Sequence, residues 1–395
     1  MKLLVFAHTP PPFHGQSYMV KLMLDGLKRT PSSGESALQI SHVDAKLSSN
    51  LEAIGKFQLG KLLRVIGYCA QAWFHRFVTA ADTFYYVPAP GLRAAVYRDW
   101  IVMFLCRPLF KKVIFHWHAA GLSEWLETNS RTWERKITHW LLDGVDLSIV
   151  LSEFARGNAE SFSPRKIEVI PNGIPDPCEN FAESLLPVRQ ARFRSRKAGQ
   201  QTRFTVLFMG ACTTAKGLFA ALDAIALLER RFAETRKPIA IRFIVAGDFA
   251  SEEERRRFQQ RIAEPDLRGQ LETSGNDSIV VYKGFVEGAE KQELFREADC
   301  LCFPSLYPAE GQPVTIVEAL AFGLGIVATR WGGIPELLAG ANAQLIDDQD
   351  STAIAAALEA APNNDATLTN RHLFLDRYRV DKFVRRMTDV FLVVD

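Results

Sequence analysis

Two glutamates flank a glycine-containing segment in the second half of the chain. Glu310 and Glu318 are separated by seven residues, and Gly311 follows the first of them directly. With a helix beginning near Val314, such a loop can offer backbone N–H groups to a diphosphate, with a carboxylate on each side for hydroxyl groups. A structural role is the alternative for Glu318, because Thr315-x-x-Glu318 has the S/T-x-x-E pattern of a capping box.

A lysine stands where another helix is expected to begin. Phe208-Met-Gly210-Ala-Cys-Thr-Thr-Ala-Lys216-Gly217 follows an apolar run of strand length. A lysine in this position can neutralise a phosphate together with the N–H groups of the helix start. The order Lys-Gly differs from the GxxxxGK[ST] of a P-loop. A solvated lysine is the alternative.

A glycine near the start of the chain follows the first expected strand. The segment Thr9-Pro-Pro-Pro-Phe-His-Gly15-Gln-Ser17 opens a helical pattern. Gly15 would let the backbone approach a ligand closely. The segment is not the GxGxxG fingerprint of dinucleotide sites. A tight turn without a ligand is the alternative.

Two histidines follow another expected strand, in Phe115-His116-Trp117-His118. We expect the two rings to point to opposite faces of this extended segment. They would then not bind one metal together without a bend. A single histidine could still donate to a sugar hydroxyl or a phosphate, and a structural or exposed pair is the alternative.

No metal site is predicted. Asp348-Gln-Asp350 matches a DxD string, but such short strings are common, and this one lies far along the chain from the other loops. The spacing of Cys300-Leu-Cys302 suits neither zinc nor a redox CxxC pair. We expect the six cysteines to be reduced and mostly buried.

Length and composition limit the class of protein. The chain has 395 residues, 48% hydrophobic and 23% charged, with a formal net charge of +2. These values exclude a disordered chain, a collagen-like fibre and a disulfide-stapled miniprotein, and they argue against a nucleic-acid binder that relies on bulk charge. No apolar run reaches the roughly 20 residues of a membrane-spanning helix. We expect a cytoplasmic protein that can touch a membrane only from the side.

Strand-length apolar runs alternate with helical patterns in two successive halves, which predicts an α/β fold with parallel sheets. The proline-rich stretch 171–177 and the basic tract after it separate the halves. The last segment, 377–394, has the pattern of an amphipathic helix. The expected strands are 3–7, 83–87, 112–115, 147–151 and 167–170 in the first half, and 204–209, 241–246, 279–282, 300–303 and 326–329 in the second.

The ordered set of motifs resembles the retaining glycosyltransferases of family 4, also called glycosyl transferases group 1, which have the GT-B fold. The motifs cover most of the chain and are densest in the second half. They are strand-loop-Gly15-helix, Ile170-Pro-Asn172-Gly173-Ile174, Gly210…Lys216-Gly217, Pro304-Ser305, Glu310-x7-Glu318-Ala319 and Gly332-Gly333-Ile-Pro-Glu336.

The resemblance implies two Rossmann-like domains that face each other across a cleft. An acceptor-binding domain would span 1–171 and a nucleotide-sugar-binding domain 202–376, joined by a linker over 172–201. A C-terminal helix would occupy 377–395, with packing back on the N-terminal domain as one option.

The resemblance also assigns roles to residues. Glu310 and His118 would be catalytic, at the donor sugar and the leaving phosphate. Six residues would bind the donor, through contacts with its phosphates, ribose, base and sugar. These are Gly15, Lys216, Phe285, Gly311, Gln312 and Glu318.

The implied activity is hexosyl transfer with retention, without metal or cofactor. The donor would be a UDP- or GDP-linked sugar, and the acceptor a hydroxyl of a glycan or lipid-linked glycan. Cell-surface polysaccharide, lipopolysaccharide or glycolipid synthesis is the expected setting. A sugar-nucleotide epimerase or phosphorylase of the same fold and a non-catalytic nucleotide-sugar-binding partner remain alternatives.

A local excess of basic residues indicates contact with an anionic membrane. Ten basic and three acidic residues lie between Lys46 and Lys112, and aromatic and aliphatic residues are interleaved with them. Basic residues favour an anionic surface, and aromatic residues favour the membrane interface. The alternative is that these aromatic residues form ordinary core beneath a solvated basic face.

Overall fold

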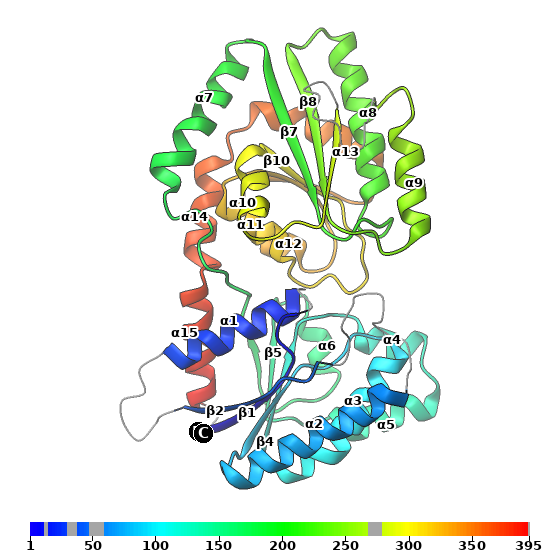
Figure 1. The fold of residues 1–395 in the computed structure, drawn as a ribbon, viewed down its shortest axis with the longest axis vertical. Coiled ribbons are helices and arrows are strands. Elements are labelled where there is room, and N and C mark those ends of the chain that lie inside the picture. Colours follow the sequence, from blue (N-terminus) through cyan, green and yellow to red (C-terminus); the bar gives the residue numbers. More distant parts are fainter. Residues whose placement is uncertain (12–14, 30–37, 47–58, 268–278, 394–395) are drawn as a thin grey trace. The chain divides into compact units, whose positions relative to one another are not determined.

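The computed structural model describes residues 1–11, 15–29, 38–46, 59–267 and 279–393 (Figure 1). Contacts between residues divide the chain into two compact units, and each is described by itself. The first unit comprises Met1–Pro175, Pro308–Gln312 and Tyr378–Asp395. The second unit comprises Asp176–Tyr307 and Pro313–Arg377.

The first unit is built on a parallel sheet, six-stranded in its described part. The central strands are buried on both faces, so near-continuous apolar runs, rather than alternating ones, form them. In spatial order the strands are β2 (Gln39–Val43), β1 (Lys2–Phe6), β3 (Thr83–Tyr86), β4 (Lys112–Trp117), β5 (Leu147–Val150) and β6 (Ile167–Val169).

Helices cover the first sheet. Three of them, α2, α3 and α5, lie side by side in one layer (Figure 1). On another side α15 packs against α1, where a Cβ on Gly26 would lie 2.3 Å from Val384 Cγ2. The helices are α1 (Gly15–Arg29), α2 (Leu59–Val78), α3 (Arg93–Cys106), the 3-10 turn η2 (Arg107–Leu109), α4 (Leu122–Thr128), α5 (Thr132–Leu142), α6 (Arg156–Glu160) and α15 (Val380–Val393).

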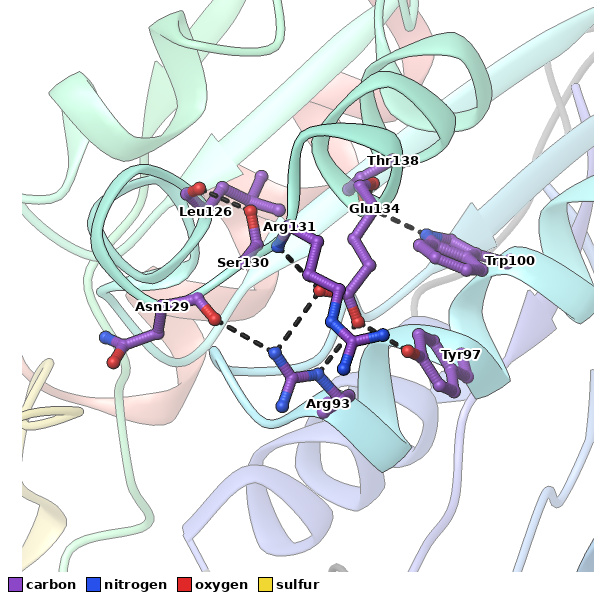
Figure 2. A network of polar contacts seen from close by, with 9 residues as sticks. All are labelled: Arg93, Tyr97, Trp100, Leu126, Asn129, Ser130, Arg131, Glu134 and Thr138. Carbon is purple, nitrogen blue, oxygen red and sulfur yellow. Dashed lines mark hydrogen bonds and ion pairs between the residues drawn. The ribbon is translucent and has the colours of Figure 1, made fainter.

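A buried carboxylate fastens α5 to α3 (Figure 2). The Glu134 carboxylate accepts hydrogen bonds from Arg93 Nε at 2.8 Å, from the backbone N–H of Arg131 at 2.7 Å and from the Tyr97 hydroxyl. Burial alone would raise the pKa of Glu134, but the donors, led by Arg93, lower it to about 2. The carboxylate therefore stays ionised inside the helix layer.

The second unit contains another parallel sheet, also six-stranded among the residues described. Its core packs Phe204, Phe208 and Phe243 of the central strands against Leu222 and Ile225 of α8. In spatial order the strands are β12 (Ala343–Ile346), β11 (Gly325–Thr329), β10 (Cys300–Phe303), β7 (Thr202–Met209), β8 (Ile239–Ala246) and β9 (Val280–Gly284).

The expected two α/β halves with parallel sheets are confirmed. The helices of the second unit follow its strands along the chain. They are the π-helical turn η3 (Phe181–Leu185), α7 (Leu186–Lys197), α8 (Leu218–Glu234), α9 (Glu252–Ile262), α10 (Gly288–Glu297), α11 (Val314–Ala321), α12 (Ile334–Leu337), α13 (Ser351–Ala360), the 3-10 turn η4 (Ala361–Asn363) and α14 (Thr367–Arg377).

The basic tract expected within the linker 172–201 is instead largely helix α7 of the second unit. The Arg189 side chain is buried and donates to the carbonyls of Ala298 at 2.8 Å and Phe295 at 2.9 Å. These carbonyls end α10, and a cation there satisfies groups that the helix leaves unpaired. Arginine spacing alone does not distinguish this role from a solvated tract.

Among the residues described, no helix is both long and apolar enough to span a bilayer.

Candidate functional site

Two loops at the carboxyl ends of neighbouring strands pack against each other in the second unit. The loop after β7 carries Lys216, and the loop after β10 leads to α11. Gly217, with φ of +80°, begins α8, and a Cβ on it would lie 2.2 Å from the Pro304 carbonyl oxygen. Because any side chain there would collide with backbone, a glycine is required for this close approach.

Main-chain carbonyls hold these two loops together. The backbone N–H of Leu306 donates to the Ala215 carbonyl at 2.9 Å. Gln349 Nε2 donates to the same carbonyl at 3.1 Å and to the Pro304 carbonyl at 2.8 Å. Thr329 Oγ1 donates to the Ser305 carbonyl at 2.5 Å. Both loops are therefore fixed by neighbouring elements of the second unit.

Lys216 lies over aromatic rings at this edge of the sheet. Its Nζ is 4.7 Å from the centre of the Tyr307 ring and 5.6 Å from that of Phe303. Cation–π contacts of this kind keep an ammonium in place without neutralising its charge. Lys216 can therefore offer a positive charge to a phosphate near the start of α8.

Glu318 forms an ion pair that its sequence context does not reveal. Lys291 of α10 places its Nζ 2.6 Å from Glu318 Oε1. Glu318 Oε2 is buried and has no hydrogen-bond partner in the described part of the chain. Burial raises the pKa of Glu318, and the Lys291 charge counteracts this. One carboxylate oxygen is thus held in place while the other can accept a hydroxyl.

The capping-box alternative for Glu318 is wrong. Helix α11 begins at Val314 with Pro313 at its N-cap, and no side chain caps it. Thr315 therefore lies inside the first turn, out of position for a reciprocal cap. The S/T-x-x-E pattern starts two residues after the actual N-cap of the helix.

The ribose-binding role that the resemblance implies for Glu318 predicts that Glu318→Ala weakens nucleotide binding, because a buried hydrogen bond from a ribose hydroxyl to the carboxylate would be lost. A hydrogen bond to a charged group contributes about 1.5–3 kcal/mol, so the Kd should rise by at least about tenfold. Calorimetric titration with UDP and GDP measures it. Lys291→Met is the matched control, since it breaks the ion pair and keeps the acceptor. Equal losses of melting temperature in both variants, with unchanged Kd, would leave Glu318 a purely structural role.

Glu310, Gly311 and Gln312 group with the first unit. Glu310 is 7% exposed, and a Cβ on Gly311 would lie 3.1 Å from the carbonyl oxygen of His118. Gln312 Oε1 accepts the backbone N–H of Asn172 at 2.6 Å. The first unit thus brings the Glu310 segment next to His118, at the end of β4. Local sequence patterns do not show this contact, because Glu310 and His118 are far apart in the sequence.

The two histidines share one face, so the expectation of opposite faces was wrong. Their ring centroids are 4.1 Å apart. Side chains alternate along a strand with a period of two residues, so residues two apart project to the same side. The expectation had treated residues two apart as if they were adjacent. His116 Nδ1 lies 2.6 Å from the Tyr85 hydroxyl. Burial, helped by the His118 charge, lowers the pKa of His116 well below its ordinary value, so His116 supports His118 as a neutral ring.

The remaining predicted residues lie in different units. Gly15 is the first residue of α1 in the first unit, and its neighbour His14 lies outside the described residues. Phe285 follows the edge strand β9 of the second unit and is 53% exposed, so its ring is open to a planar ligand. Sequence reasoning missed the roles of Lys291 and Gln349, which act across long separations without a local motif.

The DxD string caps a helix. Asp350 accepts the backbone N–H groups of Thr352 at 3.2 Å and Ala353 at 3.1 Å at the start of α13. Asp348 accepts the N–H of Asp350 at 2.9 Å. Within the described ranges, no group of three or more His, Cys, Asp or Glu side chains is placed to hold a metal ion.

Known proteins resemble both the sequence and the fold. Residues 203–364 match the family model for glycosyl transferases group 1. A protein named for colanic acid biosynthesis, the glycosyltransferase WcaL of Escherichia coli (strain K12), is 29% identical over 47% of this chain and 42% of its own length. A D-inositol 3-phosphate glycosyltransferase of Arthrobacter sp. (strain FB24) is 28% identical over 46% of this chain and 39% of its own. These matches span less than half of either relative.

Solved structures match over nearly the whole chain. HepE of Anabaena in complex with UDP-glucose has a TM-score of 0.66 at 17% identity, with 98% of this chain and 99% of that chain covered. Sucrose-phosphate synthase from Thermosynechococcus elongatus has a TM-score of 0.67 at 14% identity, with 99% and 98% covered. Identities this low establish the fold alone. With its two parallel α/β units the chain has the GT-B fold, and its residues 203–364 are similar to the glycosyl transferases group 1.

Proposed function

We propose that this protein is a retaining hexosyltransferase that uses a nucleotide-diphosphate sugar. The observation that carries the proposal is the Glu318 carboxylate, which is fixed by Lys291 through one oxygen and keeps the buried second oxygen for a ligand. It lies within the region that matches the family model, together with Lys216. A buried acceptor without a partner is costly unless a ligand satisfies it.

The charges suit cleavage of an anomeric bond. Breaking that bond puts positive charge on the sugar and negative charge on the departing diphosphate. Lys216 and the N–H groups at the start of α8 would stabilise the negative end. Glu310 would favour the positive, oxocarbenium-like sugar. The acceptor hydroxyl would then attack from the face that the diphosphate leaves, its proton passing to the leaving phosphate, so configuration is retained.

The acceptor that we propose is a hydroxyl of a glycan or lipid-linked glycan, in polysaccharide or glycolipid synthesis at the cytoplasmic face of a membrane. The relative named for colanic acid biosynthesis supports a polysaccharide setting. The HepE complex supports a UDP-linked donor. GDP-linked sugars are equally compatible with the proposal, because the roles proposed for Glu318 and Lys216 concern ribose and diphosphate, which both donors share.

The test is a thermal-shift screen over UDP- and GDP-linked sugars, followed by transfer assays with the sugar that stabilises the fold. A ligand at 100 times its Kd adds about 2.7 kcal/mol of stability, which raises the melting temperature measurably. NMR of the anomeric proton in the product reports retention. Conversion of the donor without an acceptor would favour an epimerase. Binding without turnover over a broad acceptor set would favour a non-catalytic partner.

Activity should survive chelation of divalent metals, because Lys216 and backbone N–H groups supply the positive charge for the diphosphate. Transfer is measured before and after dialysis against EDTA, with and without added Mg²⁺ or Mn²⁺. The expected rates agree within about twofold. Complete loss with EDTA and recovery with Mn²⁺ would overturn metal independence.

A further inference from the structure

We propose that the outer surface of helices α2, α3 and α5 docks on an anionic lipid bilayer. The proposal rests on the proposed function only for the reason to approach a membrane, which is a lipid-linked acceptor. We call this surface the aromatic face. Its exposed apolar side chains are Leu63, Ile66, Phe74, Phe77, Phe104 and Trp140.

Helix α2 is apolar on both of its sides. Its inner side buries Val65, Cys69 and Ala72 against the first sheet, each at 4% exposure or less. Its outer side leaves Phe74 62% and Phe77 71% exposed. Globular helices ordinarily place polar residues on the solvent side. The alternative that the aromatic residues of this region are ordinary core therefore fails for these two rings.

The three helices form one continuous layer (Figure 1). Trp73 Nε1 donates to the Leu105 carbonyl of α3 at 3.0 Å. Phe104 of α3 and Trp140 of α5 lie with ring centroids 6.3 Å apart, and they are 60% and 69% exposed. The Glu134 network of Figure 2 also fastens α5 to α3, near the starts of both helices. The exposed rings are therefore held on a rigid support.

The charged side chains that these helices present to solvent are basic. Helix α2 contains three basic residues and no acidic one. The sole acidic residue of α3 is Asp99 and that of α5 is Glu134, and both are buried in ion pairs, with Arg98 and Arg93. No carboxylate of the three helices therefore faces solvent, whereas Arg64 does.

This combination fits a bilayer better than a second copy of the chain. In a two-fold dimer this face would pack against the same face of a second copy. The basic residues of both copies would then meet without acidic partners, which is unfavourable. An anionic bilayer supplies the opposite charge through its headgroups and an apolar layer for aromatic rings. One-sided insertion of an apolar helical surface is how interfacial helices bind membranes.

The experiment is flotation of the full chain with vesicles of phosphatidylcholine containing 30% phosphatidylglycerol, at low and high salt, and with pure phosphatidylcholine. Phe74→Ser/Phe77→Ser should lower the partition coefficient by at least about tenfold, because two large apolar groups no longer enter the interface. Arg64→Glu should weaken binding to the anionic vesicles and not to the neutral ones. Leu368→Ser, at an exposed apolar position of α14 in the second unit, is the matched control and should bind like the wild type.

Absence of vesicle binding at low salt, or binding unchanged in Phe74→Ser/Phe77→Ser, would overturn the proposal. So would a dimer in analytical ultracentrifugation that the same double substitution dissociates while vesicles are not bound. The experiments distinguish a failure of membrane docking from a failure of the proposed transferase function. Glu310→Gln should bind vesicles normally, and Phe74→Ser/Phe77→Ser should still transfer sugar to a short water-soluble acceptor.

Discussion

Glu310→Gln should reduce sugar transfer by roughly two to three orders of magnitude while the Kd for the nucleotide changes less than about twofold. The substitution preserves the size of the side chain and removes its charge. That charge matters where positive charge develops on the sugar, in the transition state rather than in the bound donor. Single-turnover rates and calorimetric titration with the nucleotide separate the two effects.

The control for this result is Glu127→Gln, which removes an exposed carboxylate from helix α4 of the first unit. It should retain most of the transfer activity. Glu310 groups with His118 through Gly311, so a shift of the loop could also lower the rate. A melting temperature unchanged in Glu310→Gln excludes that explanation. Full activity of Glu310→Gln, or loss of nucleotide affinity equal to the loss of rate, would contradict the assigned role.

Glu134→Ala should destabilise the first unit by about 2–4 kcal/mol. The substitution removes the acceptor of three donors and the anchor between α3 and α5 in Figure 2. Removing one partner of a buried ion pair lowers the free energy of unfolding more than removing one partner of a surface pair. Because Arg93 is half-exposed, water can solvate it after the substitution, which reduces this loss. Urea unfolding followed by circular dichroism measures it. Glu124→Ala, an exposed glutamate on the neighbouring α4, should change stability by less than about 0.5 kcal/mol.

The contribution of Glu134 should depend on pH in a defined direction. Its folded pKa of about 2 lies below the ordinary value of 4.5. The native state therefore favours the ionised carboxyl, and its stabilisation is fully present above about pH 4.5. It is lost as the pH falls from there toward 2. The difference in unfolding free energy between wild type and Glu134→Gln should thus be constant from pH 6 to 8 and shrink below 4.5. A constant difference down to pH 3 would contradict this account.

The sequence predicts the central strands and the edge strands β6 and β9, but it misses the edge strands β2 and β12. Strands such as β5 and β10 are buried on both faces, so their residues are continuously apolar and stand out in the sequence. The edge strands β2 and β12 were not predicted. They are less buried and contain Gln39, Ser41 and Gln344, and so they lack a strong apolar run.

Site residues were identified where a loop motif follows a strand, but their partners were not. Lys291 reaches Glu318 across 27 residues, and Gln349 reaches Ala215 across 134. Such pairs depend on how helices pack over the sheet, which local patterns do not encode. The helix start at Val314 was placed correctly, yet the capping pattern beside it was misleading, because Pro313 occupies the N-cap. Whether a capping pattern acts depends on where the helix starts, and here the N-cap lies two residues before Thr315.

The hydrogen bonds that hold the Lys216 loop allow many of its side chains to change during evolution. Leu306, Gln349 and Thr329 all donate to main-chain carbonyls, at Ala215, Pro304 and Ser305. Every residue type supplies a carbonyl, so the side chains on the accepting residues can be exchanged without loss of these bonds. A substitution at the exposed Ala215 can therefore change the surface beside Lys216 while the hydrogen bonds beneath it stay the same. Gly217 is the exception, because its backbone contact with Pro304 tolerates no side chain.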